Sequence, residues 1–119
     1  MRVLLVDDEE KFVSRLAERL ELRGFEADWA TTSDEALTKA GSKEYDIAVL
    51  DVKMPRLSGI DLKKKLEKLV PRMKFVFVTG HGSEEDYHIG MREGACCLIK
   101  PFKIETLVEK IGNALEGID

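Results

Sequence analysis

One uncharged apolar run that ends in a carboxylate constrains this chain more than any other feature. Residues 47–50 read Ile-Ala-Val-Leu and lead directly into Asp51. A continuous apolar run of this kind is typical of a strand that is covered on both faces, as in a parallel sheet. Pro55 and the pair Ser58-Gly59 then break the chain before a lysine-rich helical pattern begins. We therefore expect Asp51 at the end of a buried strand, although for one isolated aspartate a simple turn start is the common alternative.

The rest of the chain alternates between strand and helix patterns. Strands are expected at residues 2–6, 26–30, 47–50, 75–78 and 95–99. Helices are expected from residue 9 or 10 to Gly24, from an N-cap at Ser33 to Gly41, from Leu62 to just before Pro71, from Ser83 to Gly94, and from Ile104 to Leu115. Five such pairs in 119 residues predict a single α/β domain over residues 1–119, with a parallel sheet and helices on both faces. We expect the flavodoxin-like (βα)5 strand order 2-1-3-4-5, which places the charged strand 26–30 at an edge.

Composition favours a cytoplasmic protein without a nucleic-acid or membrane surface. The sequence is 44% apolar and 35% charged, and it has no run of about 18 apolar residues that could span a membrane. Because the net charge is −4, we interpret Lys63-Lys64-Lys65 as the solvated face of a helix and not as a nucleic-acid site. Cys96 and Cys97 are neighbours on one expected strand and are interpreted as reduced thiols. His81 and His88 have no partner at ligand spacing and are interpreted as exposed polar residues.

Polar side chains follow four of the five expected strands. Asp7 and Asp8 come after the first strand, Asp51 after the third, Thr79 after the fourth and Lys100 after the fifth. In an open parallel sheet, ligands bind beyond the carboxyl ends of the strands at the topological switch point, which here lies between the first and third strands. We therefore expect these five residues to lie together in one site at the carboxyl ends of the strands.

Three neighbouring carboxylates would raise one another's pKa values unless a cation joined them. Oxygen ligands without histidine or cysteine favour Mg²⁺ or a similar hard ion, and Mg²⁺ also binds phosphoryl groups. A carboxylate can act as a nucleophile and form an aspartyl phosphate, provided that other groups position it and neutralise charge. Asp51 fits the nucleophile, Lys100 the ammonium and Thr79 the hydroxyl.

The ordered motifs resemble the response-regulator receiver domain of bacterial two-component signalling, over nearly the whole chain. They are Val6-Asp7-Asp8, Leu50-Asp51-Val52-Lys53-Met54-Pro55 with Gly59, Val78-Thr79-Gly80, and Gly94-Ala95 before Lys100-Pro101-Phe102. The resemblance implies that Asp51 accepts a phosphoryl group from a phosphohistidine on a sensor kinase or phosphotransfer protein, and thereby switches a protein-interaction surface. It also implies that Asp8 and Asp51 bind Mg²⁺ with the Lys53 carbonyl, that Asp7 acts mainly through water, that Thr79 and Lys100 bind the phosphoryl oxygens, and that Lys100-Pro101 is a cis peptide.

Three positions bear on how such a switch would behave. Receivers usually carry Tyr or Phe three residues before the lysine that follows the fifth strand, and this chain has Cys97 there. We therefore expect phosphorylation to shift the conformational equilibrium only partly toward the active state. The structural change should be located around residues 80–94 and should be weak at the fifth strand. Lys53 lies two residues after Asp51, and His81 lies two residues after Thr79. In receivers these loop positions flank the path of the attacking water, so we expect both residues to tune the lifetime of the phosphoryl group.

Three other functions fit the sequence less well. A receiver-like module that is never phosphorylated is disfavoured by the intact acidic residues, Thr79 and Lys100. A Mg²⁺-dependent phosphatase of the haloacid-dehalogenase type carries the motif Asp-x-Asp after its first strand. This chain has Asp51-Val52-Lys53, with a lysine in place of the second aspartate. A flavin carrier is disfavoured because the acidic residues 7–10 would repel a cofactor phosphate. The sequence thus predicts a signalling module that catalyses only its own phosphorylation and dephosphorylation.

Overall fold

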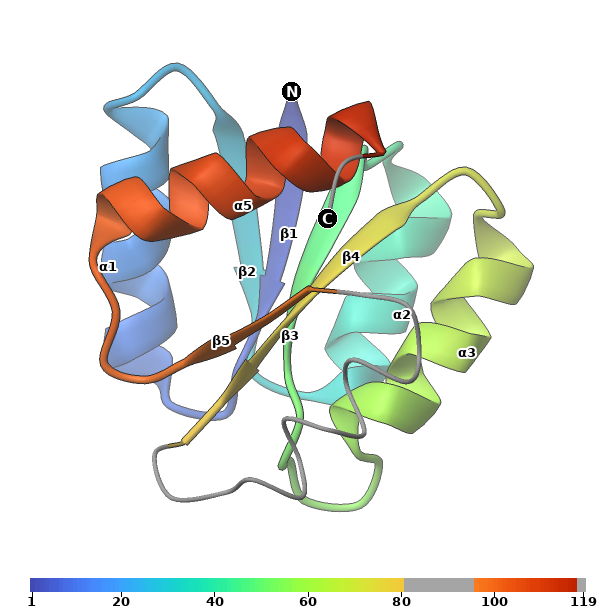
Figure 1. Ribbon diagram of the computed structural model, residues 1–119. Helices are drawn as coiled ribbons and strands as arrows, with labels where there is room; N and C mark the ends of the chain where they lie inside the picture. The colour runs from blue at the N-terminus through green and yellow to red at the C-terminus, as the bar shows by residue number, and fades with distance from the viewer. Residues whose placement is uncertain (81–95, 118–119) are drawn as a thin grey trace.

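The computed structural model describes residues 1–80 and 96–117, which form a five-stranded parallel sheet between two layers of helices (Figure 1). Its elements are β1 (Arg2–Val6), α1 (Glu10–Glu21), β2 (Glu26–Ala30), α2 (Ser33–Ser42), β3 (Ile47–Asp51), α3 (Gly59–Leu69), β4 (Lys74–Thr79), β5 (Cys96–Ile99) and α5 (Ile104–Glu116). The strand order is β2-β1-β3-β4-β5, as expected from the sequence. The expected helix at residues 83–94, together with Ala95, lies outside the described residues.

The sheet has two cores because successive strand residues face opposite sides. On one face, Val3, Leu5 and Val49 pack in a cluster that contains the buried stripes of α1 and α5. On the other face, Leu4 and Leu50 pack with the buried residues of α2 and α3. β3 is buried along its whole length, which explains its uninterrupted apolar run.

The parallel register aligns the carboxyl ends of the strands. Val6 lies opposite Leu50, so the residues that follow β1 lie beside the end of β3. Asp51 lies opposite Val78 on β4, and Thr79 lies opposite Ile99 on β5. The polar residues that follow the strands in the sequence therefore lie at the carboxyl end of the sheet.

The expected boundaries of α2 are wrong by one residue at each end. Thr32 is the N-cap, because its hydroxyl accepts a hydrogen bond from the Glu35 amide, whereas Ser33 is already helical. The Ser33 hydroxyl instead donates to the Leu57 carbonyl at 3.2 Å. α2 continues past Gly41 to Ser42, because Gly41 does not adopt the left-handed conformation that ends many helices.

The interpretation of the whole lysine run as solvated is wrong for Lys63. Its side chain is buried: Nζ lies 5.7 Å from the centroid of the Phe75 ring and 3.4 Å from Glu67 Oε1. Lys63 falls on the same helical stripe as Gly59, Leu62 and Leu66, so it faces the sheet, and its methylenes pack there as an apolar side chain would. Lys64 and Lys65 are exposed, as expected.

The edge strand β2 carries a polar cluster. Lys39 on α2 donates to the carbonyl oxygen of Trp29, and its Nζ lies 5.8 Å from the centroid of the Trp29 ring. One residue earlier, Asp28 Oδ2 accepts hydrogen bonds from the Tyr45 hydroxyl at 2.7 Å and from Lys43 Nζ at 3.1 Å. Charged residues are thus compatible with β2 because it lies at an edge.

The two cysteines differ in burial. Cys97 is buried in the core on the α2 and α3 side, and Cys96 is partly exposed. Within residues 1–80 and 96–117, no helix is both long enough and apolar enough to cross a membrane.

Candidate functional site

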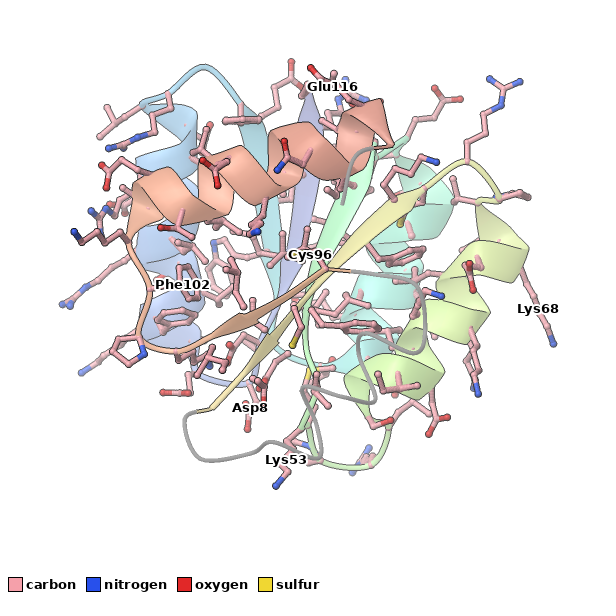
Figure 2. The ribbon with its side chains drawn as sticks, in the orientation of Figure 1. Asp8, Lys53, Lys68, Cys96, Phe102 and Glu116 are labelled. Atoms are coloured by element: carbon pink, nitrogen blue, oxygen red, sulfur yellow. The ribbon has the colours of Figure 1, made fainter. Side chains whose placement is uncertain are left out.

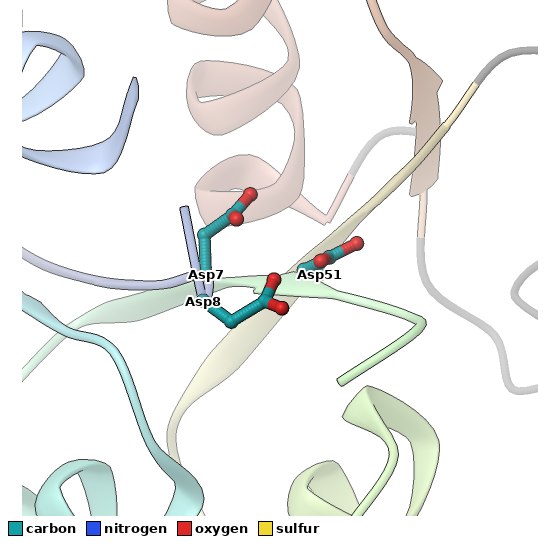
Figure 3. Close-up of side chains that lie close together, drawn as sticks. All are labelled: Asp7, Asp8 and Asp51. Atoms are coloured by element: carbon teal, nitrogen blue, oxygen red, sulfur yellow. The ribbon is translucent and has the colours of Figure 1, made fainter. Parts of the chain in front are cut away.

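Three aspartates meet where β1 and β3 end. Asp7 and Asp8 follow β1, Asp51 is the last residue of β3, and one carboxylate oxygen from each lies within 4.8 Å of the others (Figure 3). Asp7 and Asp51 are buried, whereas Asp8 is exposed. Figure 2 shows Asp8 and Lys53 at the opposite end of the molecule from Glu116. The predicted convergence of the three carboxylates is therefore present.

Both oxygens of Asp7 already have partners. Oδ1 accepts a hydrogen bond from the Glu9 amide at 2.9 Å, and Oδ2 accepts one from Lys100 Nζ at 2.7 Å. Burial raises the pKa of Asp7, and these two bonds offset that effect only in part, so the pKa stays above its ordinary value. Asp7 thus links the end of β1 to the residue that follows β5.

Burial also raises the pKa of Asp51, to about 7, and the negative charge of Asp7 adds to the effect. The Lys100 ammonium and the Lys53 amide lower this pKa but do not cancel the rise. The folded protein therefore favours the protonated form of Asp51 more than water does. A bound cation would offset both the burial and the repulsion that favour this form.

The donor set fits a hard cation. Asp7, Asp8 and Asp51 supply only carboxylate oxygens, and among the described residues no histidine or cysteine joins the cluster. The side chain of Lys53, two residues after Asp51, is exposed. These residues can hold an ion of the Mg²⁺ or Ca²⁺ class.

Thr79 and Lys100 lie next to each other through their backbones. Thr79 ends β4 and is 1% exposed, and its carbonyl oxygen accepts the Lys100 amide at 2.8 Å. The Thr79 hydroxyl lies 3.4 Å from the Gly80 carbonyl. The Lys100-Pro101 peptide is cis, as the resemblance implies. His81, which was expected to tune the phosphoryl lifetime, lies outside the described residues.

Two contacts of Lys100 were missed by the sequence reasoning. Its Nζ donates to Glu9 Oε1 at 3.1 Å and lies 4.5 Å from the centroid of the Phe12 ring. Burial lowers the pKa of Lys100, but the bonds to Asp7 and Glu9 outweigh burial and raise it overall. No sequence pattern indicates these contacts, because Glu9 reads only as an acidic helix start.

The role of Gly59 was also understated, since the sequence suggested only a turn. Its amide donates to the Val52 carbonyl at 2.9 Å, and a Cβ built on Gly59 would lie 2.1 Å from the Asp51 carbonyl oxygen. Only glycine can start α3 this close to the backbone of Asp51. In the sequence, this close approach is indicated only by the pair Ser58-Gly59 that follows an aspartate at a strand end.

A family comparison agrees with this geometry. The model of the response regulator receiver domain matches residues 3–112. Among curated proteins, the chain is 37% identical over 111 residues to a CpxR homolog, a transcriptional regulatory protein of Haemophilus influenzae, covering 92% of this chain and 48% of that protein. It is 36% identical over 102 residues to the alkaline phosphatase synthesis regulator PhoP of Bacillus subtilis, covering 85% and 42%. The chain thus spans about half the length of these relatives.

Solved structures show the same architecture. A receiver domain protein from Clostridium thermocellum superposes with a TM-score of 0.87 at 33% identity, over 98% of this chain and 94% of that one. A response regulator from Burkholderia pseudomallei, solved with a phosphorylated aspartic acid, calcium ion and citrate, has a TM-score of 0.84 at 31% identity, over 98% and 69%. The acidic cluster is typical of the receiver metal site. By sequence, fold and acidic site, this chain belongs to the family of response regulator receiver domains, the signalling modules of two-component systems.

Proposed function

We propose that Asp51 accepts a phosphoryl group from a phosphohistidine on a sensor kinase or phosphotransfer protein. The observation that carries this proposal is the position of Asp51, buried at the end of β3 beside two other carboxylates and near the charge of Lys100. A carboxylate with these neighbours can be ionised and aligned for attack. The phosphorylated aspartic acid in the Burkholderia relative supports the same chemistry.

The reaction is an in-line displacement at phosphorus. A carboxylate oxygen of Asp51 forms the new P–O bond while the P–N bond to the donor histidine breaks, and the imidazole leaves with the electron pair. Lys100 follows β5, and Thr79 is the last residue of β4. In this proposal the Lys100 ammonium and the Thr79 hydroxyl donate hydrogen bonds to the phosphoryl oxygens. Water later hydrolyses the acyl phosphate and returns Asp51 to a carboxylate. The exposed side chain of Lys53 borders the path of that water and tunes its rate.

Mg²⁺ is the cofactor that we propose for this reaction. Asp8 and Asp51 would bind the ion directly, with the Lys53 carbonyl, while Asp7 acts through water because both of its oxygens are already hydrogen-bonded. When bound, Mg²⁺ supplies positive charge that offsets the carboxylates and the phosphoryl oxygens. The raised pKa of Asp51 supports this proposal, because a nearby cation favours the ionised carboxylate.

The partners follow from the family. We propose residues 1–119 as one receiver domain in the cytoplasm, controlled by a sensor kinase and acting on an output domain or protein through a protein-interaction surface. The net charge of −4 gives no reason to propose direct nucleic-acid binding by this domain.

Phosphorylation with a small phosphodonor tests the assignment. The protein is incubated with acetyl phosphate and Mg²⁺, and intact mass spectrometry measures the gain of one phosphoryl group. Asp51→Asn should abolish the gain, whereas Asp34→Asn, an exposed aspartate in the first turn of α2, should not. An undiminished signal in Asp51→Asn would overturn the assignment. Failure of the wild-type protein to gain mass would favour a receiver-like interaction module.

A further inference from the structure

The ammonium of Lys100 lies in a site with three walls. Asp7 Oδ2 and Glu9 Oε1 accept its hydrogen bonds at 2.7 and 3.1 Å, and the face of the Phe12 ring lies 4.5 Å away. The side chain of Lys100 is 15% exposed. A carboxylate pair and an aromatic face are each favourable partners for an ammonium. Neither hydrogen bond goes to Asp51.

Glu9 and Phe12 are both fixed by their local structure. Glu9 is the N-cap of α1, and its amide donates to Asp7 Oδ1, so its backbone is tied to the carboxylate that also holds Lys100. Phe12, in the first turn of α1, packs edge-on against Phe102, with ring centroids 6.1 Å apart. The Glu9 backbone and the Phe12 ring therefore have partners other than the Lys100 side chain.

The backbone of Lys100 is anchored, so its ammonium can change partners through side-chain rotation. The Lys100 amide donates to the Thr79 carbonyl at 2.8 Å. Phe12 lines a cavity of about 10 Å³ together with Asp7 and Asp51, so the aromatic wall reaches the acidic site. A lysine that leaves the ring has the carboxylate of Asp51 within the same neighbourhood.

We propose that Glu9 and Phe12 are positioning residues that form a resting site for Lys100 and compete with the phosphoryl group on Asp51 for its ammonium. This inference rests on the proposed phosphorylation of Asp51. Contacts made only in the resting state oppose the phosphorylated state by the free energy they contribute. Weakening either wall should therefore favour the state in which Lys100 contacts the phosphoryl group.

The expected effects are moderate because Glu9 is 66% exposed. Exposed ion pairs correspond to roughly a twofold to fivefold change in an equilibrium constant, and a cation–π contact contributes a similar factor. Glu9→Gln should bind beryllofluoride, an analogue of the aspartyl phosphate, about two to five times more tightly than wild type at saturating Mg²⁺. Phe12→Leu should act in the same direction.

Two matched variants separate this effect from general electrostatics and from packing. Glu10→Gln removes the same charge one residue later, at an exposed position in the first turn of α1, and should bind beryllofluoride as wild type does. Phe12→Tyr keeps the aromatic face and should restore wild-type affinity. The ε-methylene protons of Lys100 give a direct readout, because a group over an aromatic ring resonates upfield. That upfield shift should disappear in Phe12→Leu and in wild type after beryllofluoride is added.

The outcomes are distinct. If wild type binds beryllofluoride through Asp51 but Glu9→Gln matches Glu10→Gln, the resting site is overturned while the proposed function stands. Retention of the upfield Lys100 signal in the beryllofluoride complex would also overturn it. If wild type does not bind beryllofluoride, or if Asp51→Asn binds it equally well, the proposed function fails and this inference fails with it.

Discussion

Gly59 approaches the backbone of Asp51 so closely that no side chain fits between them. A Cβ on Gly59 would lie 2.1 Å from the Asp51 carbonyl oxygen and 3.1 Å from Cα of Val52. These neighbours are backbone atoms and cannot rotate away. The first residue of α3 therefore determines how near the helix can come to the end of β3.

Gly59→Ala should destabilise the protein and disturb the acidic site. Forcing the helix away from β3 should lower the free energy of unfolding by about 1–3 kcal/mol, as overpacking does elsewhere. The measurement is urea denaturation together with Mg²⁺ titration. Gly41→Ala is the matched control, because a Cβ built on Gly41 has nothing within 4 Å. Alanine is also more favourable than glycine inside a helix, by about 0.5–1 kcal/mol. Equal stabilities for the two variants would contradict the steric argument.

The raised pKa of Asp51 predicts a specific pH dependence of stability. The folded-state pKa of about 7 lies above the ordinary carboxyl value of 3.8, so the folded state favours the protonated form. Its contribution to stability is fully present below about pH 4 and is lost as the pH rises through 7. Without a divalent cation, Asp51→Asn should be more stable than wild type by about 2–4 kcal/mol at pH 8 and should match it near pH 4.

Urea denaturation at several pH values in EDTA checks this prediction. Added Mg²⁺ should stabilise wild type at pH 8 and should have little effect on Asp51→Asn, because the ion replaces the proton as the neutralising charge. A wild type and a variant with parallel pH profiles would show that Asp51 ionises as an ordinary exposed carboxylate.

The two aspartates after β1 should differ in their importance for metal binding. Asp8 is exposed, whereas both oxygens of Asp7 accept hydrogen bonds. Asp8→Ala should lower Mg²⁺ affinity more than Asp7→Ala, for which we expect the roughly 10–100-fold loss of an outer-shell change. Isothermal titration of Mg²⁺ into each variant measures both losses. Equal losses, or a larger one in Asp7→Ala, would contradict the ranking.

The hydrogen bond from Tyr45 to Asp28 should contribute measurably to stability. Burial acts to raise the pKa of Asp28, but the bonds from Tyr45 and Lys43 outweigh it, so the pKa is lowered. Tyr45→Phe should therefore cost about 1 kcal/mol at pH 7. This difference should shrink as the pH falls below the ordinary carboxyl value of 3.8 and through the lowered pKa of folded Asp28. A double-mutant cycle with Asp28→Asn isolates the pair, and a coupling near zero would show that the bond adds nothing.

Sequence reasoning could identify the strand ends because burial leaves a direct record in residue type. β3 is covered on both faces, so its residues are all apolar until Asp51, and the parallel order then determines which strand ends are neighbours. Asp7, Asp8 and Asp51 could be grouped on this basis alone. The same logic placed the charged strand β2 at an edge.

Contacts between distant segments left no comparable record. Glu9 and Phe12 meet Lys100 across about 90 residues of sequence, and only the packing of the loop after β5 against α1 brings them together. The charge of Lys63 predicts a solvated side chain, but its helical phase matches the buried positions of α3 and determines where it lies. The closeness of Gly59 to Asp51 likewise depends on the angle at which α3 approaches the sheet.

The bond from Lys39 to the Trp29 carbonyl also bears on how copies of this chain can associate. A strand from a second molecule could lengthen the sheet at β2 only by pairing with the backbone groups that β2 leaves available. Lys39 already occupies one of them and would be displaced from both the carbonyl and the indole face. An ammonium at a sheet edge is a known guard against such templated growth. Polymerisation through β2 is therefore disfavoured.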